Sequence, residues 1–431
     1  MNEVEPEVFA TIKNLFATKT RRRLFENFLS LSFLQFANYI FPLITLPYLV
    51  RVLGPEKYGL IAFVQAFIGY FQILTDYGFN LSATREISIN MENKEKVSEI
   101  FSSVMIIKFF LLLLSLGLMT IIVFSFKKFR QNWLSYYLAF GMVLGQTLFP
   151  IWFFQGMERM RYITFLNVLA KLIFTIAIFI FVKKSSDYLY VPLLNSLGFV
   201  VSGILALWIV FKEFGIKFKI VDADNIYKHL KDGWKIFLSV VSGNIYGQGH
   251  TFILGLLTSN KLVGYYAAAH RIVAALVSFS QPVAQSIFPY LSRLGEDKSK
   301  IKLYFYRIFK YVFVLDLLLL LFLFSLSIQR ILNIYTLVTG YTAKEGIISF
   351  LGWSIIGFFT IMNVIMDPFI VSLREDKRRL KMYLLVGFSF LFFSPILTYF
   401  WSYKGMLISM FIVEVSIFTF SNMIIRSSIN K

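Results

Sequence analysis

The feature that most constrains this chain is a series of long apolar stretches separated by short charged breaks. Of the 431 residues, 57% are hydrophobic and 16% are charged, whereas a soluble domain is about 45–50% apolar and about 25% charged. A bilayer core about 30 Å thick takes about 20 helical residues. The sequence therefore predicts an all-α polytopic membrane protein with about twelve transmembrane helices. They are expected near residues 27–50, 58–80, 100–125, 133–153, 162–182, 189–211, 234–257, 264–290, 305–328, 346–372, 382–402 and 405–426.

Lysine and arginine are distributed unequally between the two sides that these helices define. With the N-terminus in the cytoplasm, the segments on that side hold 27 Lys and Arg, against 11 in the opposite loops. Basic residues concentrate in cytoplasmic loops, so we expect both termini to be cytoplasmic. The first apolar stretch is long and lacks a small-residue cleavage site, so it is expected to remain as a transmembrane helix rather than to be removed as a signal peptide.

Composition excludes several classes of function. The chain has no cysteine and three histidines, without an HExxH or paired-histidine spacing, so no metal centre is expected. The net charge of +19 lies mainly in short segments between apolar runs, which favours membrane topology over nucleic-acid binding. The loops are too short to hold the donor and acceptor of a glycosyltransferase or polymerase, so we do not expect an enzyme.

Two stretches of the chain resemble each other. Gly59 and Gly264, each at the start of a predicted helix after a tight polar turn, lie 205 residues apart, and Asn38 and Asn244 lie 206 apart. A repeat in the same orientation indicates two lobes related by an axis along the membrane normal. We expect residues 1–220 to form an N-terminal lobe of spans 1–6 and residues 221–431 a C-terminal lobe of spans 7–12, around a central cavity. Chance similarity between two apolar segments is the alternative.

Basic and polar groups fall inside the predicted spans. Charged side chains at the bilayer centre are costly and normally face a cavity or a partner. Arg271 and Lys171 are the predicted ligands of an anionic diphosphate because their donors suit phosphate oxygens. Arg51 is placed at the external mouth, with His250 and Asn38 along the cavity. The alternatives are a structural ion pair for Arg271 and hydrogen-bonded packing for His250.

Acidic groups inside the spans could couple transport to an ion gradient. Asp316 and Glu414 lie near the centres of apolar spans, and burial favours the neutral form of a carboxyl group. Such a group could bind H⁺ or Na⁺ on one side of the membrane and release it on the other. A permanent salt bridge is the alternative for both residues. Asp76 is a third candidate, although its place near a cytoplasmic helix end also suits helix termination.

Four motifs carry a resemblance to a known family. They are LPYLVRVLGPEKYGLIAF (residues 46–63), TDYGFNLSATREIS (75–88), FPIWFFQGMERMRYIT (149–164) and VGYYAAAHRIV (263–273). The chain resembles the Wzx-type O-antigen and polysaccharide flippases, whose superfamily also contains the multidrug exporters and the lipid II flippases. The resemblance implies a two-lobe transporter of the bacterial inner membrane. Its implied substrate is undecaprenyl-diphosphate-linked oligosaccharide, moved from the cytoplasmic to the periplasmic leaflet by alternating access.

Residue by residue, the resemblance supports Arg51, Asp76, Arg85 and Glu86 as motif positions, and Arg271 as a basic cavity position. His250 departs from the family pattern, where another polar and often acidic residue is expected. Twelve spans rather than fourteen argue against the lipid II branch.

The expected partners are the lipid-linked glycan, membrane lipids and polysaccharide polymerase or assembly proteins; no cofactor is expected beyond a coupling ion. Two alternative functions remain open. The first is a cation-coupled multidrug antiporter of the same fold, and the second is an integral-membrane enzyme of polysaccharide biosynthesis.

Overall fold

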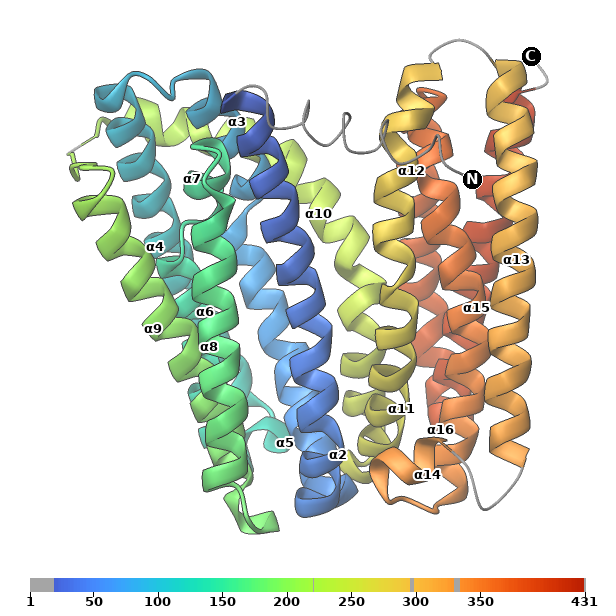
Figure 1. Ribbon diagram of the computed structural model, residues 1–431. Helices are drawn as coiled ribbons and strands as arrows, with labels where there is room; N and C mark the ends of the chain where they lie inside the picture. The colour runs from blue at the N-terminus through green and yellow to red at the C-terminus, as the bar shows by residue number, and fades with distance from the viewer. Residues whose placement is uncertain (1–18, 220, 295–297, 329–333, 430–431) are drawn as a thin grey trace, which may run out of the picture. The chain divides into compact units, whose positions relative to one another are not determined.

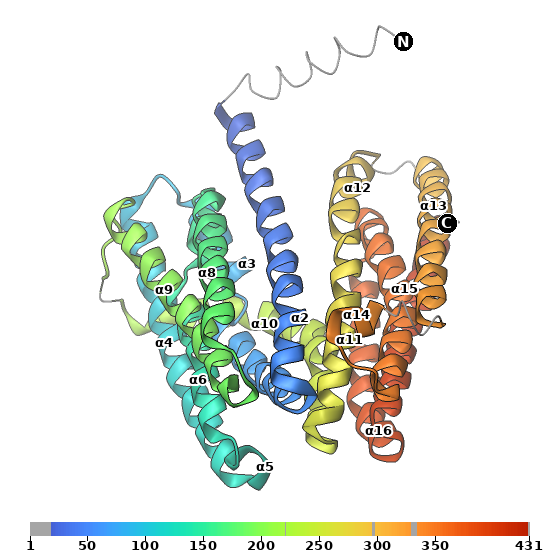
Figure 2. The same cartoon turned by 60° about the horizontal axis from the view of Figure 1, so that its bottom comes forward.

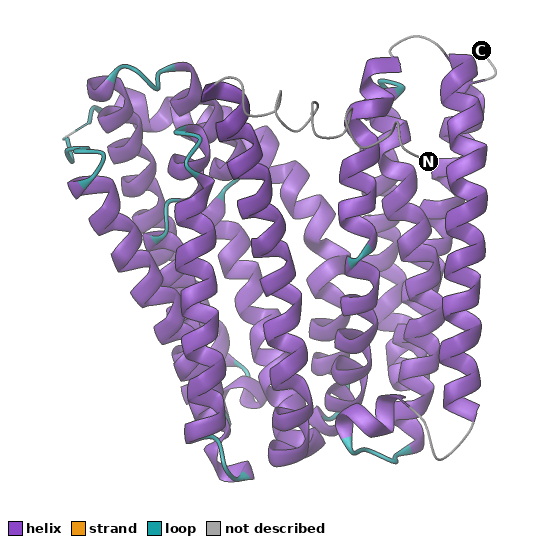
Figure 3. Cartoon of the chain, viewed as in Figure 1, coloured by secondary structure: helices purple, strands orange, loops and turns teal. Residues whose placement is uncertain are grey.

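The computed structural model describes residues 19–219, 221–294, 298–328 and 334–429, and these residues form helices and no strand (Figures 1 and 3). The helices are α2 (Lys19–Asp76), α3 (Phe79–Ile89), α4 (Lys94–Ser125), α5 (Lys127–Arg130), α6 (Trp133–Leu148), α7 (Ile151–Gly156), α8 (Met160–Phe181), η1 (Ser185–Leu189), α9 (Tyr190–Lys212), α10 (Ala223–Leu257), α11 (Asn260–Ser278), α12 (Ser280–Leu294), α13 (Lys298–Ile328), α14 (Ile334–Thr339), α15 (Lys344–Ser372) and α16 (Asp376–Ile429).

Nine helical segments in the described residues are long and apolar enough to cross a membrane. Two of them contain 57 and 54 residues, more than twice the length that one crossing needs. Each is interrupted by a non-helical residue, Gly54 (φ 74°) in α2 and Ser402 (φ 54°) in α16. The remaining predicted span, 234–257, lies on α10. The expected stretches are therefore mostly helical, although 58–80, 133–153 and 264–290 each run across a break between two helices. The prediction of an all-α polytopic membrane protein is confirmed.

The helices group into two compact units. Unit 1 draws on Met1–Phe41, Phe71–Ala177 and Leu193–Phe237, and unit 2 on Pro42–Tyr70, Ile178–Pro192 and Leu238–Lys431. This grouping by contacts does not test the predicted lobe boundary near residue 220, which stays a prediction.

Aromatic packing forms the core of unit 1. Trp152 and Phe153 are fully buried, and the ring of Phe101 on α4 lies 5.6 Å and 5.8 Å from theirs. Phe214 closes the cluster at 5.1 Å from Phe153. The hydroxyl of Thr84 on α3 donates to the carbonyl of Trp152 at 3.1 Å. Two of the family-like motifs, 75–88 and 149–164, therefore meet in the interior of unit 1, where they hold α3, α4 and α7 together.

In unit 2, the two repeat glycines lie where α2 and α11 cross. A Cβ on Gly59 would overlap the backbone of Asn260 and Gly264, and a Cβ on Gly264 would overlap the carbonyl of Pro55. Small residues allow this close approach of helix backbones inside membranes. The positions matched from the sequence are thus neighbours in space.

Candidate functional site

Unit 2 contains a cavity of about 470 Å³, which falls within the usual size range of small-molecule sites. Four helices surround it: α10, α12, α15 and α16. Its lining combines amide, hydroxyl and carboxylate groups with apolar side chains. The lining residues are Tyr246, Gln281, Ala284, Gln285, Phe288, Thr360, Asn363, Val364, Asp367, Pro368, Val371, Tyr383, Glu414 and Ile417.

Glu414 is the most deeply buried acid of this cavity, with 6% of its surface exposed. The side-chain amide of Asn363 donates to Glu414 Oε2 at 2.7 Å and to the Glu414 carbonyl at 3.0 Å. The hydroxyl of Thr360, which donates to the carbonyl of Ile356 at 3.0 Å, also lines the cavity. Among the described residues, Asn363 Oδ1 is buried without a hydrogen-bond partner, and Glu414 has no basic partner. The choice between ion coupling and a permanent salt bridge for Glu414 stays a prediction.

Asp367, the second acid of the cavity, has its charge compensated. Arg379 donates two hydrogen bonds to it, Nε to Oδ1 at 2.6 Å and Nη2 to Oδ2 at 2.8 Å. The hydroxyl of Tyr383 lies 3.4 Å from Oδ1. Bidentate arginine–carboxylate pairs are among the strongest polar contacts in proteins. Of the two carboxylates, Glu414 is the one without a basic partner among the described residues.

The predicted diphosphate ligands have different surroundings. In unit 1, Lys171 is half-buried and its amino group donates to Asn38 Oδ1. In unit 2, Arg271 is exposed on α11 and lies near the buried side chain of Tyr58. Arg51 is exposed and lies close to Gly340. Their convergence on one substrate stays a prediction.

His250 is 2% exposed and lies within an aromatic cluster of unit 2. Its ring centroid is 4.6 Å from that of His270 and 5.1 Å from that of Trp353. Its Nδ1 is 3.0 Å from the hydroxyl of Thr251. These contacts fit the packing alternative for His250, and a role in substrate binding stays a prediction.

Asp316 on α13 is 5% exposed. It borders a cavity of about 10 Å³ whose other lining residues are almost all apolar, a volume at the lower limit for one water molecule. Its Oδ2 has no hydrogen-bond partner in the part of the chain that the structure describes. Among the described residues, no ion pair joins Arg271 to Asp316 or Glu414, and the role of Arg271 stays a prediction.

Asp76, the last residue of α2, has a basic neighbour that sequence reasoning did not find. Its Oδ1 lies 4.0 Å from the Nζ of Lys108 on α4, and the two side chains are 14% and 2% exposed. Asn80 also hydrogen-bonds to the carboxylate. Asp76 thus both ends a helix and belongs to an ion pair in the interior of unit 1.

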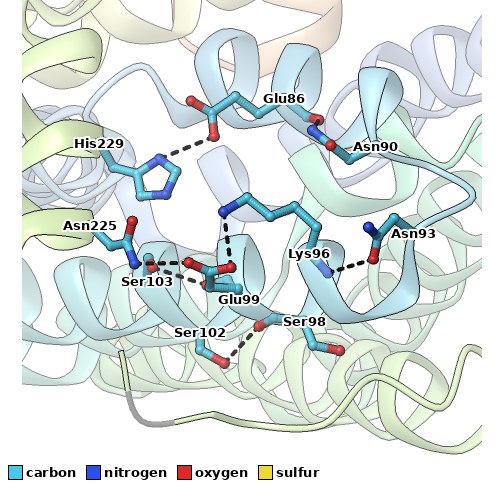
Figure 4. Close-up of polar contacts among 10 residues, drawn as sticks. All are labelled: Glu86, Asn90, Asn93, Lys96, Ser98, Glu99, Ser102, Ser103, Asn225 and His229. Atoms are coloured by element: carbon cyan, nitrogen blue, oxygen red, sulfur yellow. Dashed lines mark hydrogen bonds and ion pairs between the residues drawn. The ribbon is translucent and has the colours of Figure 1, made fainter. Parts of the chain in front are cut away.

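The motif residues Arg85 and Glu86 lie on α3. Arg85 is exposed, whereas Glu86 Oε2 lies 3.4 Å from Nδ1 of His229 at the start of α10 (Figure 4). Burial lowers the pKa of His229 below its usual 6.5, and the negative charge of Glu86 partly opposes this effect. Next to this pair, Asn225 donates to Glu99 Oε1 at 2.8 Å. Glu86 therefore connects α3 to α10 within unit 1.

Comparison with known proteins identifies the family. Residues 24–295 match the family described as "Polysaccharide biosynthesis protein". The chain belongs to this family.

Two relatives of this polysaccharide biosynthesis protein are named "Putative O-antigen transporter". The one from Escherichia coli (strain K12) is 34% identical over 267 residues, which make up 62% of this chain and 64% of that relative. The match thus spans less than two thirds of the E. coli protein's length. The relative from Shigella dysenteriae is 28% identical over 397 residues, which cover 92% of this chain and 98% of the relative.

Among solved structures, "Lipid II flippase MurJ, inward closed conformation" superposes with a TM-score of 0.68 at 12% identity, covering 93% of this chain and 87% of that one. This likeness shows the fold alone. The chain thus combines the fold of this solved structure with a buried carboxylate–amide pair, Glu414 and Asn363, at a cavity.

Proposed function

We propose that this member of the polysaccharide biosynthesis family is a flippase. It moves a polyprenyl-diphosphate-linked oligosaccharide, such as an O-antigen repeat unit, from the cytoplasmic to the periplasmic leaflet by alternating access. The observation that carries this proposal is the likeness, over almost the full length of both chains, to the Shigella relative named as an O-antigen transporter. We assign no catalytic step to the chain.

For the head group, we propose that Arg271 and Lys171 bind the diphosphate, with Arg51 as an outer basic contact. Guanidinium offers a planar fork of donors to phosphate oxygens, and the lysine ammonium offers a compact charge. The hydrogen bond from Lys171 to Asn38 supports this role because it fixes the position of the ammonium group.

For energy coupling, we propose that Glu414 binds the coupling ion, H⁺ or Na⁺. Its carboxylate, the free Oδ1 of Asn363 and the hydroxyl of Thr360 form a set of oxygen atoms at one cavity wall. Moving one charge through 100 mV supplies about 2.3 kcal/mol, so a few ions per cycle can drive the flip. Asp316 is a second candidate proton carrier, since its Oδ2 is unpaired among the described residues.

For location, we propose the bacterial inner membrane with both termini in the cytoplasm and with polysaccharide polymerase or assembly proteins as partners. The excess of lysine and arginine on one side of the predicted spans supports this orientation. Fusion of alkaline phosphatase to the C-terminus tests it, because the fusion is inactive when that end is cytoplasmic. An active phosphatase fusion would overturn the orientation.

Transport can be tested in proteoliposomes that contain lipid-linked oligosaccharide extracted from the host. We expect the purified protein to make the glycan accessible to a membrane-impermeant glycosidase. The double variant Arg271→Ala/Lys171→Ala should lose this activity, whereas the control Arg307→Ala/Lys310→Ala, on exposed residues of α13, should keep it. Full activity in the first variant would overturn the diphosphate-binding roles, and no activity in the unmodified protein would overturn the flippase proposal.

The second candidate is a cation-coupled multidrug antiporter, which the two carboxylates of the cavity favour. A cationic drug would need an uncompensated acid, and Asp367 is already paired with Arg379. Ethidium efflux from cells that produce the protein distinguishes the two functions. Efflux that is abolished by Glu414→Gln, together with absence of glycan flipping, would establish the antiporter.

A further inference from the structure

The first turns of α10 differ from the other long helices of unit 1. In Figures 1 and 2 they run across the direction of α4, α8 and α9 rather than parallel to it. Moreover, α10 has 35 residues but is absent from the nine segments of the described chain that are apolar enough to cross a membrane. The sequence of this stretch, DNIYKHLKDGWK, combines five charged residues with one tyrosine and one tryptophan.

One side of this segment is fixed to unit 1. Asn225 bonds to Glu99, and His229 lies beside Glu86 (Figure 4). At the next residue, the hydroxyl of Tyr77 donates to the carbonyl of Leu230 at 3.2 Å. Three contacts, from α4, from α3 and from the turn between α2 and α3, therefore set the rotation of the helix about its axis.

The opposite side of the helix is largely exposed, with an aromatic edge and a charged edge. Tyr227 and Trp234 are 66% and 49% exposed. Together with the exposed Lys231 they are spaced i, i+4 and i+7, so they share one face. The exposed Lys228 and Asp232 lie further round the helix, on the polar edge. An aromatic edge beside a charged edge is the pattern of a helix that lies in the plane of a bilayer surface.

The preceding loop extends this pattern. Phe218 is 58% exposed and follows the exposed Lys217. The amino group of Lys212 lies 4.6 Å from the ring centroid of Trp208, which is itself 52% exposed. Exposed aromatic rings and lysines are thus present both before and after the point where α10 begins.

We infer that Tyr227, Lys228, Lys231 and Trp234 form an interfacial surface that binds the anionic headgroups of membrane phospholipids. The aromatic rings suit the boundary between hydrocarbon and headgroups, and the lysines complement anionic phosphate. A soluble phosphate would need the lysines but would leave the exposed parts of the Tyr227 and Trp234 rings in water. This surface is independent of the transport role proposed above.

The chain contains no cysteine, so a fluorophore attached to Trp234→Cys reports on this surface alone. The protein is placed in nanodiscs of phosphatidylcholine and phosphatidylglycerol, with a nitroxide quencher attached to one lipid or the other. We expect stronger quenching by phosphatidylglycerol. Lys228→Gln and Lys231→Gln should each lower the relative association of phosphatidylglycerol at this position about fivefold, the factor that corresponds to about 1 kcal/mol per lysine.

Two control positions make the result decisive. A fluorophore on Phe110→Cys, at a 66% exposed position of α4, should be quenched equally by both lipids labelled on their acyl chains. A fluorophore on Asp232→Cys, on the polar edge, should be quenched by aqueous iodide instead. Absence of lipid quenching at Trp234→Cys would overturn the interfacial surface. Equal quenching by the two lipids, unchanged by the lysine substitutions, would overturn its preference for anionic headgroups. Circular dichroism and size-exclusion chromatography confirm the fold of each variant.

Discussion

Replacing Lys108 with methionine would leave Asp76 as an unpaired charge in the interior of unit 1. The two charged atoms are 4.0 Å apart, and the lysine side chain is 2% exposed. At an effective dielectric constant of about 20, this separation corresponds to an attraction of about 4 kcal/mol. Removing one partner of a buried pair costs about 3–5 kcal/mol. We therefore expect Lys108→Met to lower the free energy of unfolding by about that amount, because methionine fills a similar volume and leaves the carboxylate uncompensated.

The double variant Lys108→Met/Asp76→Asn should recover most of this loss, since no charge then remains in the interior and Asn80 can still bond to the amide. Reversible denaturant unfolding in detergent micelles gives all four corners of the double-mutant cycle. The matched control Lys310→Met, at an exposed position of α13, should change stability by no more than about 0.5 kcal/mol. The reasoning fails if Lys108→Met costs no more than Lys310→Met, or if the double variant is as unstable as the sum of its single changes.

Three further predictions concern other parts of the chain. Glu414→Gln should abolish the dependence of transport on an ion gradient. It should leave the melting temperature unchanged, because the glutamine carbonyl still accepts the hydrogen bond from the Asn363 amide. Proteoliposome flux under imposed pH or sodium gradients measures the first effect. Since burial lowers the pKa of His229 below 6.5, the unfolded state binds more protons in acid. The stability that neutral His229 contributes is therefore complete above about pH 6.5 and lost as the pH falls below it. Melting curves from pH 5 to 8 should show this slope, and His229→Gln should remove it. Gly264→Ala should prevent the crossing of α2 and α11, because the added Cβ would overlap the carbonyl of Pro55. The yield of monodisperse protein should therefore fall sharply. A normal yield would contradict this reasoning.

The helices could be predicted from the sequence because the bilayer imposes one length on every crossing, and hydropathy reports that length directly. The partners of charged residues could not be predicted in the same way. Lys108 and Asp76 lie on different helices and 32 positions apart in the chain, so only tertiary packing brings them together. Both residues lie inside predicted apolar spans, where an unpaired charge is costly. This shared location was the sequence signal that pointed to a pairing.

Arg379 illustrates a second limit. It lies in the basic segment 373–381, which the sequence analysis used only to predict membrane orientation. Its hydrogen bonds to Asp367 were therefore not predicted. In the same way, Arg271 was expected to contact phosphate or an acid, whereas it lies near the buried side chain of Tyr58. The sequence identifies which residues are costly to bury, but the groups that compensate them depend on helix rotation, which hydropathy does not determine.

The crossing of α2 and α11 also constrains how this gene can change. A methyl group at either Gly59 or Gly264 would overlap main-chain atoms of the opposite helix. Rotation of a neighbouring side chain cannot relieve this overlap, so we expect neither position to accept a residue larger than glycine. In a deep mutational library, both codons should tolerate almost nothing but synonymous change.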